Sequence, residues 1–179
     1  MRNLLFMNIF RKPLTEAPPS VLDEELRNLA AGVDAAARRR LGRSLAIREL
    51  DAGSCNGCEL EIQALENAFY DLERYGIRFV ASPRHADVLL VTGPVTKNMA
   101  EALARTHAAM PDPKWVVAVG DCGIDGGCFA GSYAVVGGVG EVLTVDLRIP
   151  GCPPNPKQLL EGLLTLLEAG TVAAPVARR

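Results

Sequence analysis

The sequence predicts an α/β fold in which a mostly parallel sheet carries helices on both faces. Short apolar runs of strand length recur along the chain, among them "ADVLLVTG" and "KWVVAVG", and such runs are typical of strands buried on both faces. Segments whose apolar residues have helical spacing lie between these runs. This alternation favours parallel pairing, because each helix returns the chain to the starting edge of the sheet.

The predicted elements begin with a helix over residues 21–42, which has acidic residues early and Arg38–Arg40 late, in agreement with the helix dipole. Segment 44–51 alternates apolar and polar residues and is predicted to be a strand. Gly76 is a suitable stop for the second helix, and Thr96 is a suitable cap for the third. The remaining elements are, in chain order, helix 59–76, strands 77–82 and 86–93, helix 96–110, strand 114–120, a glycine-rich loop over 120–140, strand 141–149 and helix 157–168.

Composition and charge exclude several classes of function. The chain has 179 residues, of which 49% are hydrophobic, so it can form one globular domain. A net charge of −2 and few aromatic residues give no support for nucleic-acid binding. No apolar run reaches the roughly 18 residues of a membrane span, and the start "MRNLLFMNIFRK" lacks the features of a secretory signal. Five cysteines without such a signal do not resemble a secreted disulfide framework, so a cytoplasmic location is predicted.

Four of the five cysteines follow predicted strands. The pair Cys55 and Cys58 comes directly after the first strand. Cys122 comes after the fourth strand, and Cys152 comes after the fifth. Because functional groups of such sheets gather at the carboxyl ends of the strands, these four thiols are expected on one edge of the sheet.

Three kinds of site could use these thiols. A C-x-x-C at a strand-to-helix junction suits a dithiol redox pair, but that interpretation leaves Cys122 and Cys152 without a role. A structural zinc site usually has two such pairs. An iron–sulfur cluster takes four thiolates at varied spacing, and the glycines beside each cysteine would let backbone N–H groups approach its sulfurs. The pattern favours the iron–sulfur cluster, with dithiol redox chemistry and zinc binding as alternatives.

Four motifs, "CNGCELEI", "SPRHADVLLVTGPVTKNM", "PDPKWVVAVGDCGIDGG" and "IPGCPP", resemble the small-subunit family shared by nickel–iron hydrogenases and the 20 kDa subunit of respiratory complex I. The resemblance covers about residues 44–167. It implies a flavodoxin-like domain that holds one 4Fe-4S cluster beside a catalytic centre in a separate large subunit. The implied cluster ligands are Cys55, Cys58, Cys122 and Cys152. Cys128 falls where the motif requires no cysteine, and it is expected to be a small buried residue rather than a ligand.

The spacing of the first cysteine pair separates the branches of this family. Complex I subunits of this type have two adjacent cysteines there, whereas this chain has Cys55-Asn56-Gly57-Cys58, the hydrogenase-type spacing. The chain also lacks the additional cluster domain of uptake hydrogenases, so it resembles the membrane-associated, energy-converting group that includes formate hydrogenlyase. The resemblance implies an oxidoreductase subunit that transfers electrons. The 20 kDa subunit of a complex I-like NADH–quinone oxidoreductase is the alternative, because "SYAVVGGVGEV" is also similar to complex I.

The resemblance also implies partners and a place in the cell. The expected partners are a hydrogenase-type large subunit with a nickel–iron centre, a ferredoxin-like two-cluster subunit and membrane subunits. These partners would hold the chain on the inner face of the cytoplasmic membrane. The expected organisation is an arm and helix over 1–42 that contacts partners or the membrane surface, an iron–sulfur domain over 43–169, and a frayed tail over 170–179.

A few other polar residues have both a structural and a functional interpretation. Glu59 could stabilise the start of a helix or serve as a proton relay, as the resemblance implies. Arg84, with His85 beside it, could be an exposed loop charge, or a positive group near the cluster or the large subunit. Asp121 and Asp125 in the glycine-rich segment could bind a ligand, although aspartates are also ordinary turn residues in such loops. The segment "GDCGIDGG" matches neither common phosphate-binding motif, so no bound nucleotide is predicted.

Overall fold

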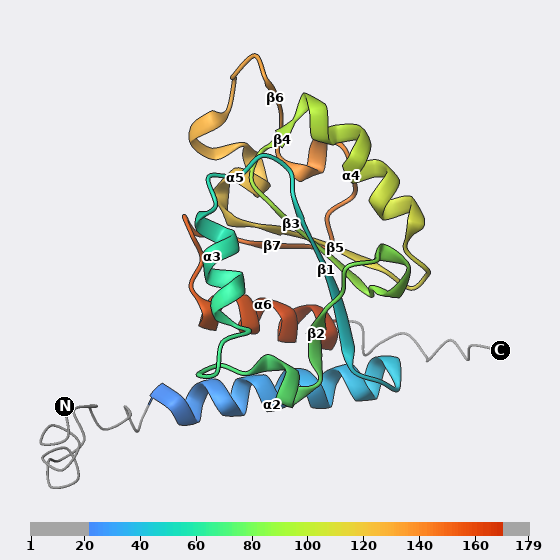
Figure 1. The fold of residues 1–179 in the computed structure, drawn as a ribbon, viewed down its shortest axis with the longest axis vertical. Helices are drawn as coiled ribbons and strands as arrows, with labels where there is room; N and C mark the ends of the chain where they lie inside the picture. Colours follow the sequence, from blue (N-terminus) through green and yellow to red (C-terminus); the bar gives the residue numbers. More distant parts are fainter. Residues whose placement is uncertain (1–21, 170–179) are drawn as a thin grey trace, which may run out of the picture.

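The computed structural model describes residues 22–169 and contains a five-stranded parallel sheet in the order β2-β1-β3-β5-β7 (Figure 1). Every neighbouring pair in this sheet is parallel. This is the flavodoxin-like strand order, in which the direction of winding reverses beside β1. The fold class predicted from the sequence is therefore confirmed. The strands are β1 Leu45–Asp51, β2 Ile77–Phe79, β3 Val88–Thr92, β5 Trp115–Val119 and β7 Leu147–Ile149.

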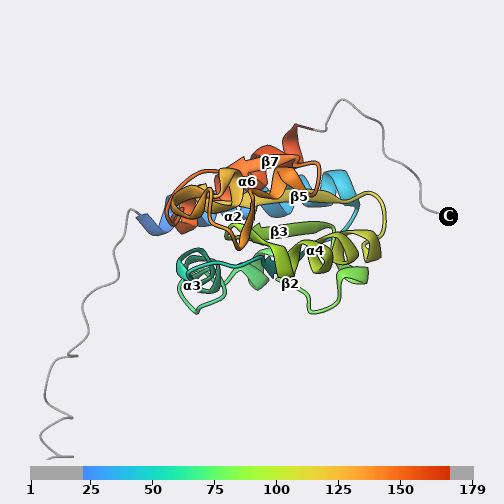
Figure 2. The ribbon, with the colours of Figure 1, turned by 90° about the horizontal axis from the view of Figure 1, so that it is seen from above.

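Helices cover both faces of the sheet, as Figure 2 shows. Helices α2 (Leu22–Leu41) and α6 (Pro156–Glu168) pack on one face, and α4 (Lys97–Ala109) packs on the other. Two short helices, α3 (Gly57–Ala64) and α5 (Gly120–Asp125), begin at the carboxyl ends of β1 and β5. The remaining elements are the 3-10 turns η1 Leu72–Tyr75, η2 Pro83–His85, η3 Gly127–Phe129 and η4 Val139–Glu141, and an antiparallel pair formed by β4 Val95–Thr96 and β6 Val135–Gly137.

Strand β3 lies at the centre of the sheet, and all five of its residues are buried. Its side chains alternate between the two faces: Leu90 packs among residues of α2 and α6, and Leu89 packs among residues of α4. On the first face, Val33 of α2 lies in the same core cluster as Leu163 of α6. Burying one such aliphatic side chain stabilises the fold by about 1.5–3 kcal/mol.

The apolar side of helix α2 therefore packs against the core of this chain. Contacts of residues 1–42 with a partner or a membrane surface stay a prediction. Residues 1–21 and 170–179, which include the expected arm and tail, lie outside the described residues. No helix in the described part is long and apolar enough to cross a membrane.

Several predicted elements differ from the structure, among them the strand expected over 77–82, which ends at Phe79. The helix expected over 59–76 ends at Ala64, because the Oδ1 of Asn67 accepts the backbone N–H groups of Phe69 and Tyr70 at 2.8 and 3.1 Å and forms a turn. The strand expected over 141–149 is confined to β7. The glycine-rich segment 120–140, expected to lack regular structure, contains α5, η3 and β6, since β6 finds a partner in β4.

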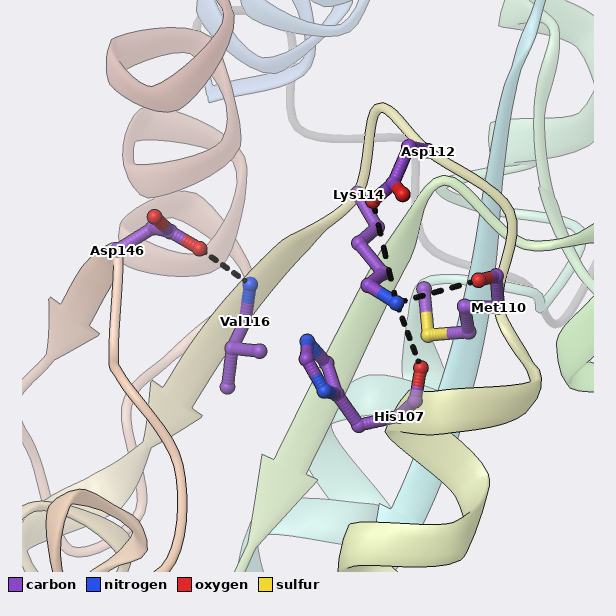
Figure 3. A network of polar contacts seen from close by, with 6 residues as sticks. All are labelled: His107, Met110, Asp112, Lys114, Val116 and Asp146. Atoms are coloured by element: carbon purple, nitrogen blue, oxygen red, sulfur yellow. Dashed lines mark hydrogen bonds and ion pairs between the residues drawn. The ribbon is translucent and has the colours of Figure 1, made fainter.

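Polar contacts hold the amino ends of the strands. Asp87 is fully buried at the start of β3, where it pairs with Arg43 and accepts the Ala46 N–H at 3.1 Å. Figure 3 shows a second group of contacts at this end, where the Lys114 ammonium donates to the last carbonyls of α4. Beside it, Asp146 accepts the N–H of Val116 at 2.7 Å. These side chains stabilise the amino edge of the sheet and leave the carboxyl edge for other uses.

Candidate metal centre

The fold brings three cysteine-bearing segments to the carboxyl edge of the sheet. Cys55 and Cys58 lie on the loop after β1 and in the first turn of α3, Cys122 lies in α5 after β5, and Cys152 follows β7. In Figures 1 and 2, α3, α5 and the end of β7 lie at the same end of the sheet. Cys55 and Cys152 are exposed, whereas Cys58 and Cys122 are half-buried.

The Cys58 thiol lies within electrostatic reach of the other three. Burial raises the pKa of Cys58 to about 12, and the charges of Glu59, Cys122, Cys55 and Cys152 contribute to this rise in that order. Burial also raises the pKa of Cys122, and the charge of Cys128 contributes more to this rise than the charge of Cys152. Four thiolates at this edge would repel one another, so a bound cationic centre is what would keep them deprotonated together.

Two glycines allow the backbone to approach these sulfurs closely. Gly120 has a φ of +78°, and a Cβ atom there would lie 2.7 Å from the Sγ of Cys58. Gly127 has a φ of +48°, and its Cβ would lie 2.8 Å from the Sγ of Cys122. Any other residue would be strained at these dihedrals and would also meet a sulfur atom. Glycine is therefore required for the space around the two half-buried thiols.

Asp121 joins two of the cysteine segments. Its Oδ1 accepts the N–H of Gly151 at 2.9 Å, and its own N–H donates to the Gly151 carbonyl at 2.9 Å. Gly151 precedes Cys152 and Asp121 precedes Cys122, so this pair of bonds sets the distance between the two loops. The sequence offers no signal for this contact, because the two residues are 30 positions apart and an aspartate in a glycine-rich segment is an ordinary turn residue.

Two further aspartates shape the same loops. The Oδ1 of Asp51 accepts the N–H groups of Gly53 and Ser54, both at 2.7 Å, and so forms the turn that leads into Cys55. The Oδ1 of Asp125 accepts the N–H of Gly127 at 2.8 Å in the turn that follows Cys122. The interpretation of Asp125 as a turn residue is confirmed.

Cys128 is exposed, so the expectation that it is a buried residue is wrong. It lies in η3, in the turn that folds back on Cys122. Its backbone N–H and its thiol both hydrogen-bond to Cys122. The physical reason for its exposure is the consecutive left-handed conformation of Gly126 and Gly127, which directs the chain outward around the sulfur.

The other predicted site residues divide between the two edges. Glu59 lies beside Cys58 in the first turn of α3, is only 7% exposed, and has no hydrogen-bond partner on either carboxylate oxygen. Arg84 and His85 lie in η2, which precedes β3, and neither is buried. They are therefore at the amino edge, and the expectation that Arg84 lies near the thiols is corrected by this placement.

Among the described residues, no three histidine, cysteine, aspartate or glutamate side chains are close enough to hold one metal ion. Thiolates that share a single zinc ion would lie about 4 Å apart, given zinc–sulfur bonds of about 2.3 Å. In an iron–sulfur cubane each thiolate binds a different iron, so its four ligands lie farther apart than the ligands of one metal ion.

Comparison with known proteins places these features in a family context. The model of the family described as NADH ubiquinone oxidoreductase, 20 Kd subunit, matches residues 55–166. Formate hydrogenlyase subunit 7 of Escherichia coli is 42% identical over 149 residues, which cover 83% of this chain and 57% of that subunit. The chain therefore spans less than two thirds of that relative.

Two archaeal proteins are matched over more of their length. A probable membrane-bound hydrogenase subunit of Pyrococcus furiosus is 44% identical over 72% of this chain and 77% of its own. An uncharacterised protein of Methanocaldococcus jannaschii is 50% identical over 68% of this chain and 82% of its own. Among solved structures, a chain of the membrane-bound sulfane sulfur reductase, an archaeal respiratory membrane complex, is 33% identical with a TM-score of 0.63, over 80% of this chain and 79% of that chain.

Proposed function

The chain belongs to the family of the 20 kDa subunit of NADH ubiquinone oxidoreductase, and we propose that it is the electron-transfer subunit of a membrane-bound hydrogenase-type complex. In this proposal Cys55, Cys58, Cys122 and Cys152 hold one 4Fe-4S cluster. The observation that carries it is the gathering of these four thiols at one edge of the sheet, with Cys58 inside the electrostatic reach of the other three.

The residues around the thiols suit such a group. A bound cluster supplies one-electron transfer, at a potential set by burial and by hydrogen bonds to its sulfurs. The close backbone approach at Gly120 and Gly127 and the N–H of Cys128 would provide part of that environment. Asp121 would keep the loops of Cys122 and Cys152 at a fixed separation through its two bonds to Gly151.

Exposed apolar side chains beside the thiols support a covering partner. Leu60 of α3 is two residues after Cys58, and it is 58% exposed. Phe129 and Tyr133 lie in the segment after Cys128, and they are 40% and 89% exposed. Large exposed apolar side chains are typical of protein interfaces. We assign this surface to the large subunit, which would contain the catalytic centre.

The first cysteine pair favours a hydrogenase-type partner over a quinone reductase. Its Cys-Asn-Gly-Cys spacing differs from the adjacent cysteines of complex I subunits. A ferredoxin-like subunit and membrane subunits complete the proposed complex, which would lie on the inner face of the cytoplasmic membrane. The decisive observation for hydrogen chemistry is in the large subunit: two C-x-x-C pairs that bind nickel would support it, and their absence would leave only the electron-transfer role.

Metal and sulfide analysis tests the cluster. Chain purified without oxygen should contain iron and acid-labile sulfide, and Cys→Ser at each of the four proposed ligands should reduce both. Cys128→Ser is the matched control and should retain them. Zinc without labile sulfide would refute the cluster. If only the changes at Cys55 and Cys58 affected function, these two residues would be interpreted as a dithiol redox pair instead of cluster ligands.

A further inference from the structure

An open hollow of about 420 Å³ lies beside β1, where β2 ends. Its walls come from three elements: the second half of β1, the exposed side of α3, and the chain that leaves β2. The lining residues are Arg48, Glu49, Asp51, Asn56, Glu59, Gln63, Phe79, Val80 and Ala81. The hollow is next to the cysteine edge, but none of the cysteines lines it.

The hollow exists because β2 is too short to cover β1. Strand β2 pairs with β1 only from Leu45 to Ile47, and the last bond is from the N–H of Val80 to the carbonyl of Ile47. Strand β1 continues along β3 as far as Asp51. Since backbone groups point alternately to the two sides of a strand, those of Glu49 and Asp51 face the same side as Ile47, where no described strand continues. The carboxyl half of β1 is therefore an open sheet edge.

Unpartnered polar atoms from both faces of the sheet lie around this edge. Among the residues that the structure describes, four buried side-chain polar atoms have no hydrogen-bond partner. They are the Nε of Arg48, the Oε1 of Glu49 and both carboxylate oxygens of Glu59. All three residues line the hollow. Buried polar groups in folded proteins are nearly always hydrogen-bonded, so a shared deficit of partners at one open edge indicates a missing binding partner.

The charge of the hollow defines that partner. Burial raises the pKa of Glu49 to about 7, and the charge of Glu59 contributes next. The Asp51 carboxylate already accepts two backbone N–H groups, whereas the Oε1 of Glu49 and both carboxylate oxygens of Glu59 lack donors. No three described side chains here are placed to hold one metal ion. What the three carboxylate oxygens lack is therefore a positively charged group that donates hydrogen bonds.

We propose that an extended segment of a partner subunit adds to the open edge of β1 and places an arginine guanidinium between Glu49 and Glu59. A guanidinium has five N–H donors and pairs well with carboxylates when desolvated, and the deficit here is three carboxylate oxygens. A backbone carbonyl of the same segment would accept from Arg48. Addition of a strand to an open edge is an established mode of peptide recognition. The inference rests on the proposed function only in requiring partner subunits.

Hydrogen exchange tests the strand directly. The complex is purified through a tag on this chain, and exchange of the Glu49 and Asp51 amides is compared with that of the isolated full chain. Both amides should exchange at least tenfold more slowly in the complex. The Leu50 amide, which faces β3, is the internal control and should be protected in both samples. Equal exchange of Glu49 and Asp51 in the two samples, as expected if water or solvent cations fill the hollow, would overturn the proposal.

Charge-neutral variants test the guanidinium. Glu49→Gln and Glu59→Gln should each reduce the partner subunits retained by the chain at least tenfold at moderate salt. Glu73→Gln removes the same charge from an exposed residue outside the hollow and should have no effect. In the isolated chain, both hollow variants should have a denaturation midpoint equal to or above the wild type, because an unpaired carboxylate has been removed. Retention equal to the wild type, or a loss matched by a lower midpoint, would refute the proposal.

The same samples separate this inference from the proposed cluster. Iron and labile sulfide are measured in the wild type and in Glu49→Gln, whose position lies outside every proposed ligand loop. A protected edge in a chain without iron would support the strand and refute the cluster. A chain that contains the cluster and has an unprotected edge would refute the strand alone.

Discussion

The backbone of Gly120 lies directly against the sulfur of Cys58, which is one of the proposed cluster ligands. Its φ of +78° would strain any other residue, and a Cβ atom would lie 2.7 Å from the Cys58 sulfur. Gly131 has a nearly identical φ of +79°, but a Cβ there would meet nothing within 4 Å. Alanine substitutions at the two positions therefore distinguish the free-energy cost of the left-handed backbone from that of the contact with sulfur.

We expect the left-handed conformation alone to lower the free energy of unfolding by about 1–2 kcal/mol in both Gly120→Ala and Gly131→Ala. In Gly120→Ala the contact with the Cys58 sulfur should add to this loss. Only Gly120→Ala should also reduce the iron and labile sulfide bound per chain, because its methyl group displaces the Cys58 sulfur. Chemical denaturation and iron analysis measure the two effects. Equal cluster content in both variants would contradict the role given to Gly120.

Asp121 provides a second test at the residue scale. Asp121→Ala removes the acceptor for the Gly151 N–H, which should cost about 1 kcal/mol of stability. It should also lower cluster content and shift the cluster's reduction potential, because the loops of Cys122 and Cys152 lose a fixed separation. Asp121→Asn retains an Oδ1 acceptor and should restore both properties. A potential measured by redox titration that is the same in all three proteins would contradict this role.

These residues also show what sequence can predict about the site. The four motif cysteines were expected on one edge because strand ends in a parallel sheet share an edge, and the fold places them there. The bond between Asp121 and Gly151 has no local pattern, since it depends on two loops meeting in space. Arg84 directly precedes the predicted strand 86–93, so the strand direction alone would have placed it at the amino edge, where the structure has it.

At the scale of elements, the amino ends of the strands are held by polar contacts, whereas their carboxyl ends lead into the cysteine loops. Asp87 at the amino end of β3 is fully buried, pairs with Arg43 and accepts the Ala46 N–H of β1. It thus aligns the starts of two central strands. The carboxyl ends of strands in the same sheet carry the cysteine loops. Stability and the proposed function should therefore respond separately to mutations at the two ends.

We expect Asp87→Ala to lower the free energy of unfolding by about 2–3 kcal/mol, because it leaves a buried N–H without an acceptor and removes the partner of Arg43. Iron content per folded chain should not change. Glu101→Ala breaks an exposed pair with Arg105 on α4 and should cost less than about 0.5 kcal/mol. Thermal or chemical denaturation measures both. A loss of iron from folded Asp87→Ala would show that the two ends are coupled.

The sequence predicted long elements better than short ones. The runs that became β3 and β5 were recognised because they are continuously apolar and buried on both faces. Helix α6 was expected over 157–168, and in the structure its start is fixed by a capping box between Asn155 and Gln158. The short pair β4 and β6 was missed, because two or three residues contain no periodicity and their pairing depends on a tertiary contact.

At the scale of the whole molecule, the strand order β2-β1-β3-β5-β7 makes β1 the strand where winding reverses. Ligands of open α/β sheets bind beside such a reversal. In this chain the same strand leads into the first cysteine pair and forms the open edge of the hollow. The proposed cluster and the proposed strand-addition site are thus adjacent because both depend on the end of β1. A segment of the partner subunit bound at this edge would therefore lie close to the proposed cluster, with which that subunit would exchange electrons.

The unpaired acid at this edge should also be detectable in the stability of the isolated chain. Folding raises the pKa of Glu49 from 4.5 to about 7, mainly through burial and then through the charge of Glu59. Between these values the folded chain holds a proton that the unfolded chain has released, so stability must fall as pH rises from about 4.5 to 7. The contribution is fully present below about pH 4.5 and is lost above about pH 7.

Glu49→Gln, which cannot lose a proton, should therefore gain stability relative to the wild type as pH rises. After allowance for partial solvent exposure of Glu49, we expect a gain of about 1–2 kcal/mol at about pH 8 over the difference at about pH 4.5. Urea denaturation of both proteins across this range measures it. In the assembled complex the sign should reverse, because the proposed guanidinium favours the charged carboxylate and lowers its pKa. If the stability of the wild type and of Glu49→Gln changed with pH in parallel, the pKa of Glu49 would not be raised in the folded chain, and this prediction would be wrong.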